Sequence, residues 1–516
     1  MLSLTKLKNL LQLDDVKGLL IYIPIGMILI FLSIEYLFFI PIYILYLFYI
    51  FKQNKILFKY VLIISVFFLL IYLIKYISYR TYNIKDLYKG IVVDKNDNSI
   101  LIKYRLNYIK CYIKNEDINI GDKILFNIKE TDINERSVEG VFSYLKYKYS
   151  KNIKIEGKLK SFQKLKSFNI YKLKRLLVNY IESFGPNSSD YLKKLVLGMS
   201  SFSDELNSNI SDAGIIYLYA ISGLHISLLS LYIKKIFRLF NMREEIISII
   251  LIIFLFFYLL MCSKSSSIER AILMISIKEI FTLLKFKFNK LDIMSISFII
   301  IHLFNPFSLF SISTYLTYLS TLIIFFYDTK NNIKLSIVLI IFSTPLILYT
   351  NSKISIFIFL FSIFFGVIFS KFFIPFTYLI LFLPFASFLY EKAVFVLNQV
   401  ISLLNDLNIM INFSIVNPFY LFLIYVLLFL LFKFKHFLKG KVVVISLLSF
   451  IIFLNYLHGV VSFIPTVKVI DVGQGDSILI RDYNNTYLID TGVSDDYHTT
   501  ISYLKHNNIK KIDYLF

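Results

Sequence analysis

The 516-residue sequence contains no tryptophan, only two cysteines, and few charged residues. Cys111 and Cys262 are too few for a disulfide framework or a zinc ribbon, and the sequence leaves open whether they pair or remain separate thiols. Charged residues make up 17% of the chain, against about 25% in soluble domains. This scarcity of charge excludes an intrinsically disordered chain and a coiled coil.

Apolar residues are abundant, and the charge that remains is strongly one-sided. Hydrophobic side chains account for 57% of the sequence, whereas soluble domains average about 45–50%. The 55 Lys and Arg residues outnumber the 34 Asp and Glu residues, giving a net charge of +21. The composition therefore predicts a polytopic α-helical membrane protein whose excess positive charge must lie outside the membrane.

A membrane-spanning helix needs about 20 mostly apolar residues, and the sequence holds many such stretches. Three precede a long polar interval and ten follow it, so we expect about 11–13 spans. The predicted spans lie near 18–34, 36–51, 57–78, 214–233, 246–262, 269–284, 291–304, 306–327, 335–350, 354–370, 374–390, 419–432 and 442–457. Asn305-Pro306 predicts a broken or re-entrant helix between two of them.

The Lys and Arg residues of the short loops predict the orientation of these spans. Twenty lie in alternate loops on the side of the N-terminus, including Lys6, Lys8 and Lys17. Only Lys264, Lys353 and Lys392 lie in the short loops of the other side. Because cytoplasmic loops carry the excess of positive charge, we expect a cytoplasmic N-terminus. The polar regions 79–185 and 459–516 would then both be extracytoplasmic.

The first polar region, 79–185, predicts a small all-β domain. Its short apolar runs are separated by turn signals such as Gly121-Asp122, a pattern typical of about five strands in an OB-like barrel. The predicted strands are 90–93, 99–104, 108–113, 123–128 and 153–157. Residues 172–184 predict an amphipathic helix on the membrane surface.

Residues 141–175 form a basic arm with eleven Lys and Arg residues and one acid, Glu156. Aromatic residues are interleaved with the lysines, which suits a single-stranded nucleic acid whose phosphates contact ammonium groups while its bases stack on rings. An ordinary solvated surface, or a patch that binds anionic lipid, is an equal alternative. The candidate DNA-binding residues are Lys146, Lys148, Lys151, Lys154, Lys158 and Lys160.

The second polar region, 459–516, predicts an α/β arrangement. Strands at 466–470, 477–481, 486–489 and 511–516 surround a helix at 497–506. Two glycine turns punctuate the region, Asp471–Asp476 and Asp490–Gly492. At 58 residues the region is too small for a comfortable independent core.

Two ionisable side chains fall inside predicted spans, where charge is costly and usually faces a bundle interior or a water-filled path. His225 lies near the middle of span 214–233, and Arg270 lies near the outer end of span 269–284. Gly223, beside Ser222, permits close backbone approach. An interhelical hydrogen bond for His225, and snorkelling to the interface for Arg270, are alternatives that remain open.

Three segments resemble the membrane domain of the ComEC family, the competence proteins that pass transforming DNA across the cytoplasmic membrane. The first, 212–229, contains the core Ser222, Gly223, Leu224 and His225. The second, 265–274, contains Arg270, and the third combines 305–309 with 315–320. The resemblance implies that Ser222, Gly223, Leu224, His225 and Arg270 belong to a channel motif.

The glycine turns of the second polar region resemble the opening of a metallo-β-lactamase-like domain. The matching residues are Asp471, Gly473, Gln474, Gly475, Asp476, Asp490 and Gly492. His498 and His506 do not fit the histidine- and aspartate-rich metal motif of that family. We therefore predict no catalytic residue and no metal ligand, and expect zinc or manganese only with a further C-terminal part. The expectation is a truncated domain.

The resemblance implies four regions and a bacterial inner-membrane location. They are N-terminal helices (1–78), an outer β domain (79–185), a channel domain (190–457) and an incomplete metallo-β-lactamase-like domain (459–516). The implied function is uptake of single-stranded DNA. The implied partners are membrane lipids, a DNA receptor, a cytoplasmic helicase or motor, and a second copy of the chain. A membrane-anchored metal-dependent hydrolase and a small-solute transporter are the alternatives.

Overall fold

The computed structural model describes most of the chain. The described residues are 18–81, 87–96, 98–113, 117–130, 138, 140, 142–286, 288–327, 331–434, 437–460, 462–483, 485–492 and 497–516. Lys6, Lys8 and Lys17, which contribute to the predicted orientation, lie outside them.

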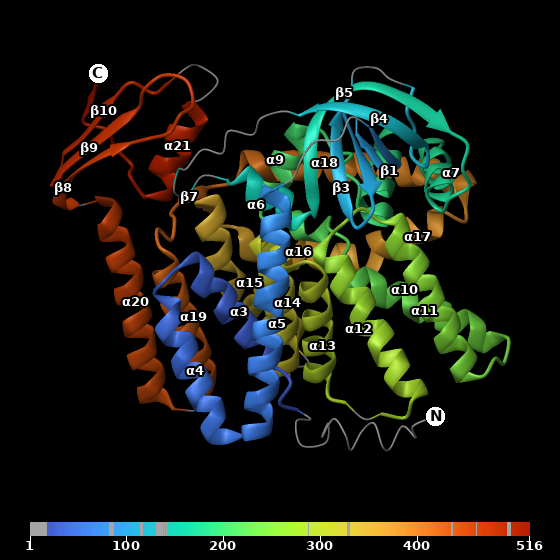
Figure 1. The fold of residues 1–516 in the computed structure, drawn as a ribbon, viewed down its shortest axis with the longest axis horizontal. Coiled ribbons are helices and arrows are strands. Elements are labelled where there is room, and N and C mark those ends of the chain that lie inside the picture. Colours follow the sequence, from blue (N-terminus) through green and yellow to red (C-terminus); the bar gives the residue numbers. More distant parts are fainter. Residues whose placement is uncertain are drawn as a thin grey trace.

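A bundle of apolar helices forms the lower part of the molecule in Figure 1. Among the described residues, seven helices are long and apolar enough to cross a membrane, and four are shorter and apolar. The chain is therefore a multi-pass membrane protein, as predicted. The bundle contains α3 (Tyr22–Glu35), α4 (Phe39–Gln53), α5 (Lys55–Arg80), α10 (Gly223–Leu239), α11 (Glu244–Met261), α12 (Ser266–Leu283), α13 (Lys290–Phe304), α14 (Ile312–Phe326), α15 (Asn332–Asn351), α19 (Pro418–Lys433) and α20 (Leu438–Val460).

The predicted spans 354–370 and 374–390 are wrong as separate helices. They are replaced by one continuous helix made of α16 (Ile358–Ile368), the π-helical turn η4 (Phe369–Phe373) and α17 (Ile374–Ile380). Lys371 and Pro375 suggest a loop in the sequence, but the widened π turn keeps the backbone helical up to Pro375, which lies at the start of α17. After η5 (Pro384–Ala386), α18 (Ser387–Asp406) is a helix that the sequence prediction missed.

Two predicted spans are interrupted at motif residues. The chain turns through η2 (Ile216–Leu218) before α10 begins at Gly223, so the predicted span 214–233 is broken near its centre. Between α13 and α14, η3 (Pro306–Phe310) confirms the break predicted at Asn305-Pro306.

The first polar region folds into the predicted barrel. Its strands are β1 (Tyr88–Asn96), β2 (Ser99–Tyr104), β3 (Asn107–Tyr112), β4 (Lys123–Glu130) and β5 (Ile153–Leu165). They close in the order β1-β2-β3-β5-β4, and β3 and β5 are parallel. The core contains Tyr88 stacked on Phe126. Gly121 makes the predicted turn with φ at +86°, a conformation that favours glycine.

Short helices connect the barrel to the bundle. They are α6 (Tyr144–Ser150), α7 (Tyr171–Glu182), α8 (Pro186–Leu192), the π turn η1 (Lys193–Leu197) and α9 (Asp204–Asp212). The predicted amphipathic helix is α7. It fixes the barrel because the Lys174 ammonium donates to the Val93 carbonyl at 3.0 Å, and the Tyr180 hydroxyl donates to the Leu381 carbonyl at 2.8 Å.

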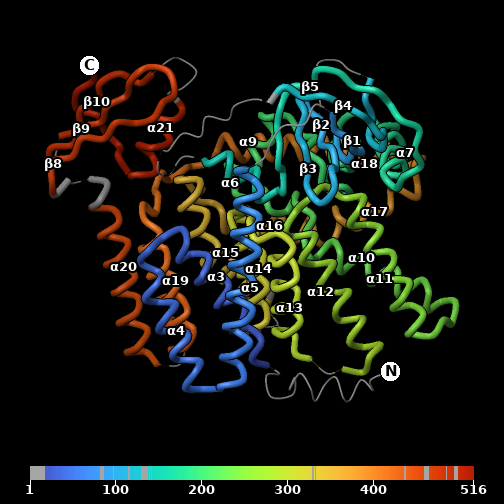
Figure 2. The backbone as a smooth tube through the Cα atoms, in the orientation of Figure 1, coloured from blue at the N-terminus to red at the C-terminus, as the bar shows by residue number. Residues whose placement is uncertain are grey.

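The C-terminal module contains a four-stranded sheet in the order β11-β10-β9-β8, with α21 (Tyr497–His506) against it. The strands are β8 (Ser462–Val469), β9 (Ile478–Tyr483), β10 (Asn485–Ile489) and β11 (Tyr514–Leu515). Only β11 is parallel to its neighbour. The barrel and this module lie at the same end of the helices, called here the module end (Figures 1 and 2). A two-stranded sheet of β6 (Lys353–Ser355) and β7 (Met410–Asn412) lies between α15 and α19 in the chain.

The two cysteines are buried in different cores and are not joined by a disulfide. Cys111 lies inside the barrel, and Cys262 packs beside α11 and α12.

One buried carboxylate ties the start of α3 to α13. Asp292 is fully buried and accepts the backbone N–H groups of Gly18 at 2.8 Å and Leu20 at 3.4 Å. It also accepts the N–H of Asn289 at the start of its own helix. These bonds satisfy amides of the turn that precedes α3 and of the N-cap of α13.

Candidate functional site

The first motif segment starts a helix and does not lie inside one. Ser222 is the N-cap of α10, and its hydroxyl oxygen accepts the Leu224 N–H at 3.3 Å. His225 reaches back, and its Nδ1 accepts the Ser222 backbone N–H at 3.2 Å. His225 therefore lies in the first turn of α10, because the Ser-Gly pair ends the preceding turn and caps a new helix. It still lies within the apolar candidate span Ile216–Leu239. Leu224 projects outward and is exposed.

His225 presents its second ring nitrogen to the interior. The ring is 2% exposed, and Nε2 has no hydrogen-bond partner among the described residues. Because Nδ1 accepts a hydrogen bond, the proton of the neutral ring lies on Nε2. An unpaired buried N–H group is costly. The Nε2–H of His225 is therefore available to donate a hydrogen bond to an acceptor outside the α10 cap.

Arg270 joins the other two motif segments to the first. Its Nη1 donates to the Thr317 carbonyl oxygen of α14 at 2.5 Å, and its guanidinium lies 5.9 Å from the Tyr318 ring centre. A Cβ atom on Gly223 would lie 3.5 Å from Nη2, so glycine allows α10 to approach the guanidinium closely. Three segments far apart in the sequence thus meet at one side chain, called here the motif junction (Gly223, Arg270, Thr317 and Tyr318).

The junction continues into a strip of buried polar atoms that lack partners. Within the described residues, the Nε of Arg270, the hydroxyl of Tyr318 and the Nε2 of His302 make no hydrogen bond. Tyr318 packs edge-on against Phe298, on which His302 stacks. Sequence reasoning missed His302, although an ionisable residue inside a predicted span is a signal that could have identified it.

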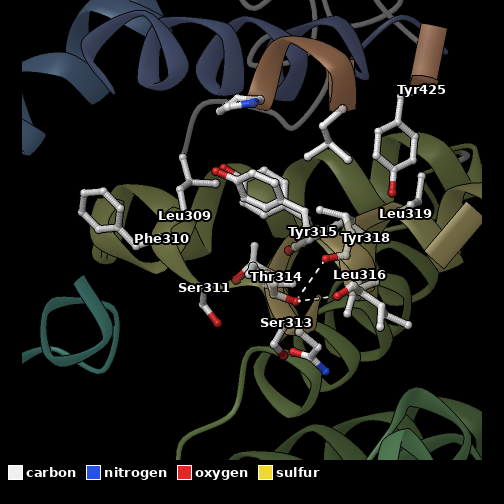
Figure 3. A pocket seen from close by; sticks show the side chains of 18 of the residues that line it. Leu309, Phe310, Ser311, Ser313, Thr314, Tyr315, Leu316, Tyr318, Leu319 and Tyr425 are labelled. Carbon is white, nitrogen blue, oxygen red and sulfur yellow. Dashed lines mark hydrogen bonds between the residues drawn. The ribbon is translucent and has the colours of Figure 1, made fainter. Parts of the chain in front are cut away.

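A large cavity lies against α14. It has a volume of about 1160 Å³, above the roughly 300–1,000 Å³ of small-molecule sites. Tyr318 lines it, so α14 is a wall shared by the motif junction and the cavity. Figure 3 shows Tyr315, Tyr318 and Tyr425 around it, with the hydroxyl groups of Ser313 and Thr314 close by.

The cavity follows α3 along its whole length. Its lining runs from Ile21, just before the helix, to Phe39 beyond its end. The 14 residues of α3 correspond to about 21 Å of helix. The other walls come from α14, α15 and α19, and α6 and His506 contribute at the module end. The cavity therefore reaches from the two modules deep into the bundle.

Two ion pairs bridge different elements at the cavity rim. The Lys146 ammonium on α6 lies 2.6 Å from the Glu35 carboxylate at the end of α3. The Lys353 ammonium on β6 bonds the Asp212 carboxylate at the end of α9. Lys146, Glu35 and Lys353 all line the cavity.

The basic arm divides into a part that faces the bundle and a part that faces away. Lys146 contacts Glu35, Lys151 donates to the Lys264 carbonyl at 2.9 Å, and Lys154 donates to the Ser78 hydroxyl at 2.9 Å. Burial lowers the pKa of Lys151 and of Lys154. Lys148 is buried, whereas Lys158 and Lys160 are exposed on β5. The structure thus separates six lysines that the sequence places in one group.

The barrel holds the loop before the motif helix α12. The Ser263 hydroxyl donates to the Asp94 carboxylate at 2.7 Å, and the Ser263 N–H donates to the Leu197 carbonyl at 2.7 Å. A cavity of about 190 Å³ separates the two parts and contains Lys174 and Glu269 in its wall. Any displacement of the barrel would therefore be transmitted to the start of the helix that carries Arg270.

The two glycine turns of the C-terminal module meet each other. Asp471 accepts the Gly473 N–H at 3.3 Å, and Asp490 accepts the Gly492 N–H at 3.2 Å. A Cβ atom on Gly492 would lie 2.8 Å from the Val472 side chain, which explains the glycine. Gly473 and Gly475 have positive φ, and Gln474 and Asp476 are exposed. No group of three or more His, Cys, Asp or Glu side chains in the described part of the chain could hold a metal ion.

Comparisons with known proteins agree with these motif segments. Residues 195–438 match the family described as "Competence protein". The chain is 26% identical over 399 residues to ComE operon protein 3 of Bacillus subtilis (strain 168). That match covers 70% of this chain and 50% of the relative, so the chain spans about half the length of the relative. No solved structure matches. These matches support a relationship of the chain to competence proteins of the ComEC type.

Proposed function

We propose that this protein acts in the uptake of transforming DNA during natural competence, and that it passes a single DNA strand across the bacterial inner membrane. The observation that carries the proposal is the cavity that follows α3 from the module end into the bundle. Its wall α14 also forms the motif junction with Arg270. The cavity wall is mainly apolar, but it carries hydroxyl groups such as those of Ser313 and Thr314, together with many aromatic rings. The bases of a single strand can stack on such rings.

The direction of transport follows from the proposed orientation. Lys234, Lys235, Arg238 and Arg243 lie in and beside the connection between α10 and α11. Because positive loops stay in the cytoplasm, that end of the bundle is assigned to the cytoplasm. The modules then face outward, and the strand moves inward from the module end.

The finer assignments extend this proposal. The barrel is assigned as an OB-like domain, and residues 459–516 as part of a metallo-β-lactamase-like domain, because its two glycine turns meet at one end of a mixed sheet. Single-stranded DNA and membrane lipids are the proposed ligands. A DNA receptor, a cytoplasmic helicase or motor, and a second copy of the chain are the proposed protein partners. Nothing among the described residues favours the hydrolase alternative.

Deleting the gene in its host and following labelled transforming DNA tests the proposal. We expect bound DNA to accumulate outside the cell while the cytoplasm receives none. An Arg270→Lys variant retains the charge but loses the Nη1 bond to Thr317, so we expect a strong reduction in uptake. Cytoplasmic label at the wild-type level in the deletion strain would contradict the proposed function.

A further inference from the structure

Two lysine side chains at the rim of the large cavity form ion pairs with carboxylates. Lys146 and Lys353 are the only Lys or Arg side chains among the described residues that line the cavity. Each forms an ion pair, Lys146 with Glu35 and Lys353 with Asp212. The lysine side chains remain 48% and 41% exposed, so a soluble anion reaches both of them.

Each ion pair joins two elements that are separate in the chain. Lys146 belongs to α6, beside the barrel, and Glu35 ends α3. Lys353 begins β6, and Asp212 ends α9. The pairs therefore do more than neutralise charge, because they connect α6 and α9 to the walls of the cavity.

We propose that Lys146 and Lys353 form a two-point binding site for the phosphodiester backbone of a single strand, and that the strand's phosphates displace Glu35 and Asp212. The inference rests on the proposed function and assigns the strand's first contact to the rim of the cavity at the module end. Exchange of one anion for another on a half-exposed lysine has a small net cost, because exposed ion pairs contribute little. A polyanion gains further from the release of its counterions.

The surroundings of Lys146 suit a nucleic acid strand. The ammonium group lies 5.3 Å from the Phe310 ring centre, and Phe142 and Tyr147 line the cavity beside it. Phe142 is 70% exposed. Exposed rings beside a cation are the arrangement on which bases stack while the backbone contacts the charge. Displacement of Glu35 would also release α6 from α3, so strand binding and opening of the rim are one event.

The absence of tryptophan provides a direct test. A Phe142→Trp substitution places a single fluorophore at the rim of the full-length protein in lipid nanodiscs. We expect an oligo-dT strand to quench it, with an affinity that falls steeply with salt. Replacing Lys146 and Lys353 together with glutamine removes two phosphate contacts and should lower the slope of log affinity against log salt by about 1.4. Arginine at both positions should restore the slope.

Matched variants separate the rim from other charges. Glu35→Gln and Asp212→Asn free the two lysines and should raise the affinity several-fold. Glu244 and Arg238 form an ion pair with a distance of 2.7 Å, and neither residue lines the cavity. Glu244→Gln frees Arg238 and should leave the affinity unchanged. Glutamine at both Lys89 and Lys103, which are exposed on β1 and β2, removes the same charge from the barrel surface and should also leave the slope unchanged.

Three outcomes would overturn the inference. The first is an unchanged salt slope in the Lys146 and Lys353 double variant whose elution and melting match the parent. The second is a loss of slope in the Lys89 and Lys103 variant instead. The third is quenching of the introduced tryptophan by brominated phospholipid but not by oligo-dT, which would show that lipid occupies the rim. Oligo-dT could bind at the rim while deletion of the gene leaves DNA uptake intact. That combination would contradict only the proposed function.

Discussion

The barrel and the C-terminal module lie at the same end of the helices but are stabilised in different ways. The barrel closes on itself, and twelve buried hydrophobic residues among those described form its core. The C-terminal sheet is open, and its core has six such residues. Val467 and Val469 on β8 are 67% and 70% exposed, so one sheet face is largely uncovered.

The difference is compensated by the way each part joins the bundle. The barrel joins the helices through an apolar contact, because Val93 of β1 belongs to the core that includes α7, and the Lys174 ammonium donates to the Val93 carbonyl. The C-terminal module instead inserts buried polar groups into the segment before α19. Asn508 accepts the Ser414 N–H at 2.6 Å and donates to the Ser414 carbonyl at 2.7 Å. A part with a small core thus depends on its docking, whereas a closed barrel depends on itself.

The largest effect is expected from emptying the barrel core. Phe126 is fully buried against Tyr88, and Phe126→Ala should lower the free energy of unfolding of the barrel by about 3–5 kcal/mol. Hydrogen exchange should accelerate in peptides of β1–β5 and remain unchanged in β8–β11. Phe142→Ala, at an exposed position, is the control. Faster exchange in both parts would show that the barrel is not independent.

A smaller effect is expected from removing the docking bond of the C-terminal module. Asn508 has φ at +56°, so Asn508→Gly removes the side chain without adding backbone strain. The buried Ser414 N–H loses its partner, which costs about 1–3 kcal/mol, whereas the Ser414 carbonyl still accepts from Asn455 at 2.7 Å. We expect proteolytic release of residues 462–516 to accelerate while the barrel is unaffected. Asn241→Gly, at an exposed position with φ at +53°, should change neither part.

The smallest effect is expected from acid. Burial opposes ionisation of Glu156, but hydrogen bonds from Tyr112 and Tyr144 and the charge of Lys110 outweigh it and lower the pKa of this carboxyl below 4.5. The stabilisation is therefore complete above pH 4.5 and is lost as pH falls through the folded-state pKa. The melting temperature of the barrel should fall with acidification in this range. A Glu156→Gln variant should show a flatter profile, and identical profiles would contradict the role of this carboxyl.

Hydrophobic periodicity and turn residues were enough to predict the helical bundle and the barrel. The strand at 99–104 was predicted at its observed bounds, and the break at Asn305-Pro306 is present. The errors occur where local rules compete. Lys371 and Pro375 suggest a loop, but a π turn keeps one helix continuous, and the mixed polarity of α18 concealed a helix. A helix whose polar side chains bond to neighbouring helices is not recognised by a search for continuous apolar stretches.

The site was predictable in its residues but not in its geometry. Arg270 could be selected from the sequence because charged residues are unusual inside spans, and Ser222 and Gly223 could be selected through the resemblance of their segment to the ComEC family. The contact of Arg270 with the Thr317 carbonyl could not, because a backbone acceptor carries no sequence signal. The same holds for Lys146, whose partner Glu35 lies 111 residues away.

The carboxylate of Asp292 sets an order of events during synthesis of the chain. It satisfies the N–H of Gly18, 274 residues earlier in the sequence. At a translation rate of about 5–20 residues per second, roughly 14–55 s separate the synthesis of these two residues. Helix α3 is therefore synthesised before the carboxylate that holds the turn preceding it, and reaches its final position only when α13 arrives. Assembly of α3 onto α13 is in this sense a late step of biogenesis.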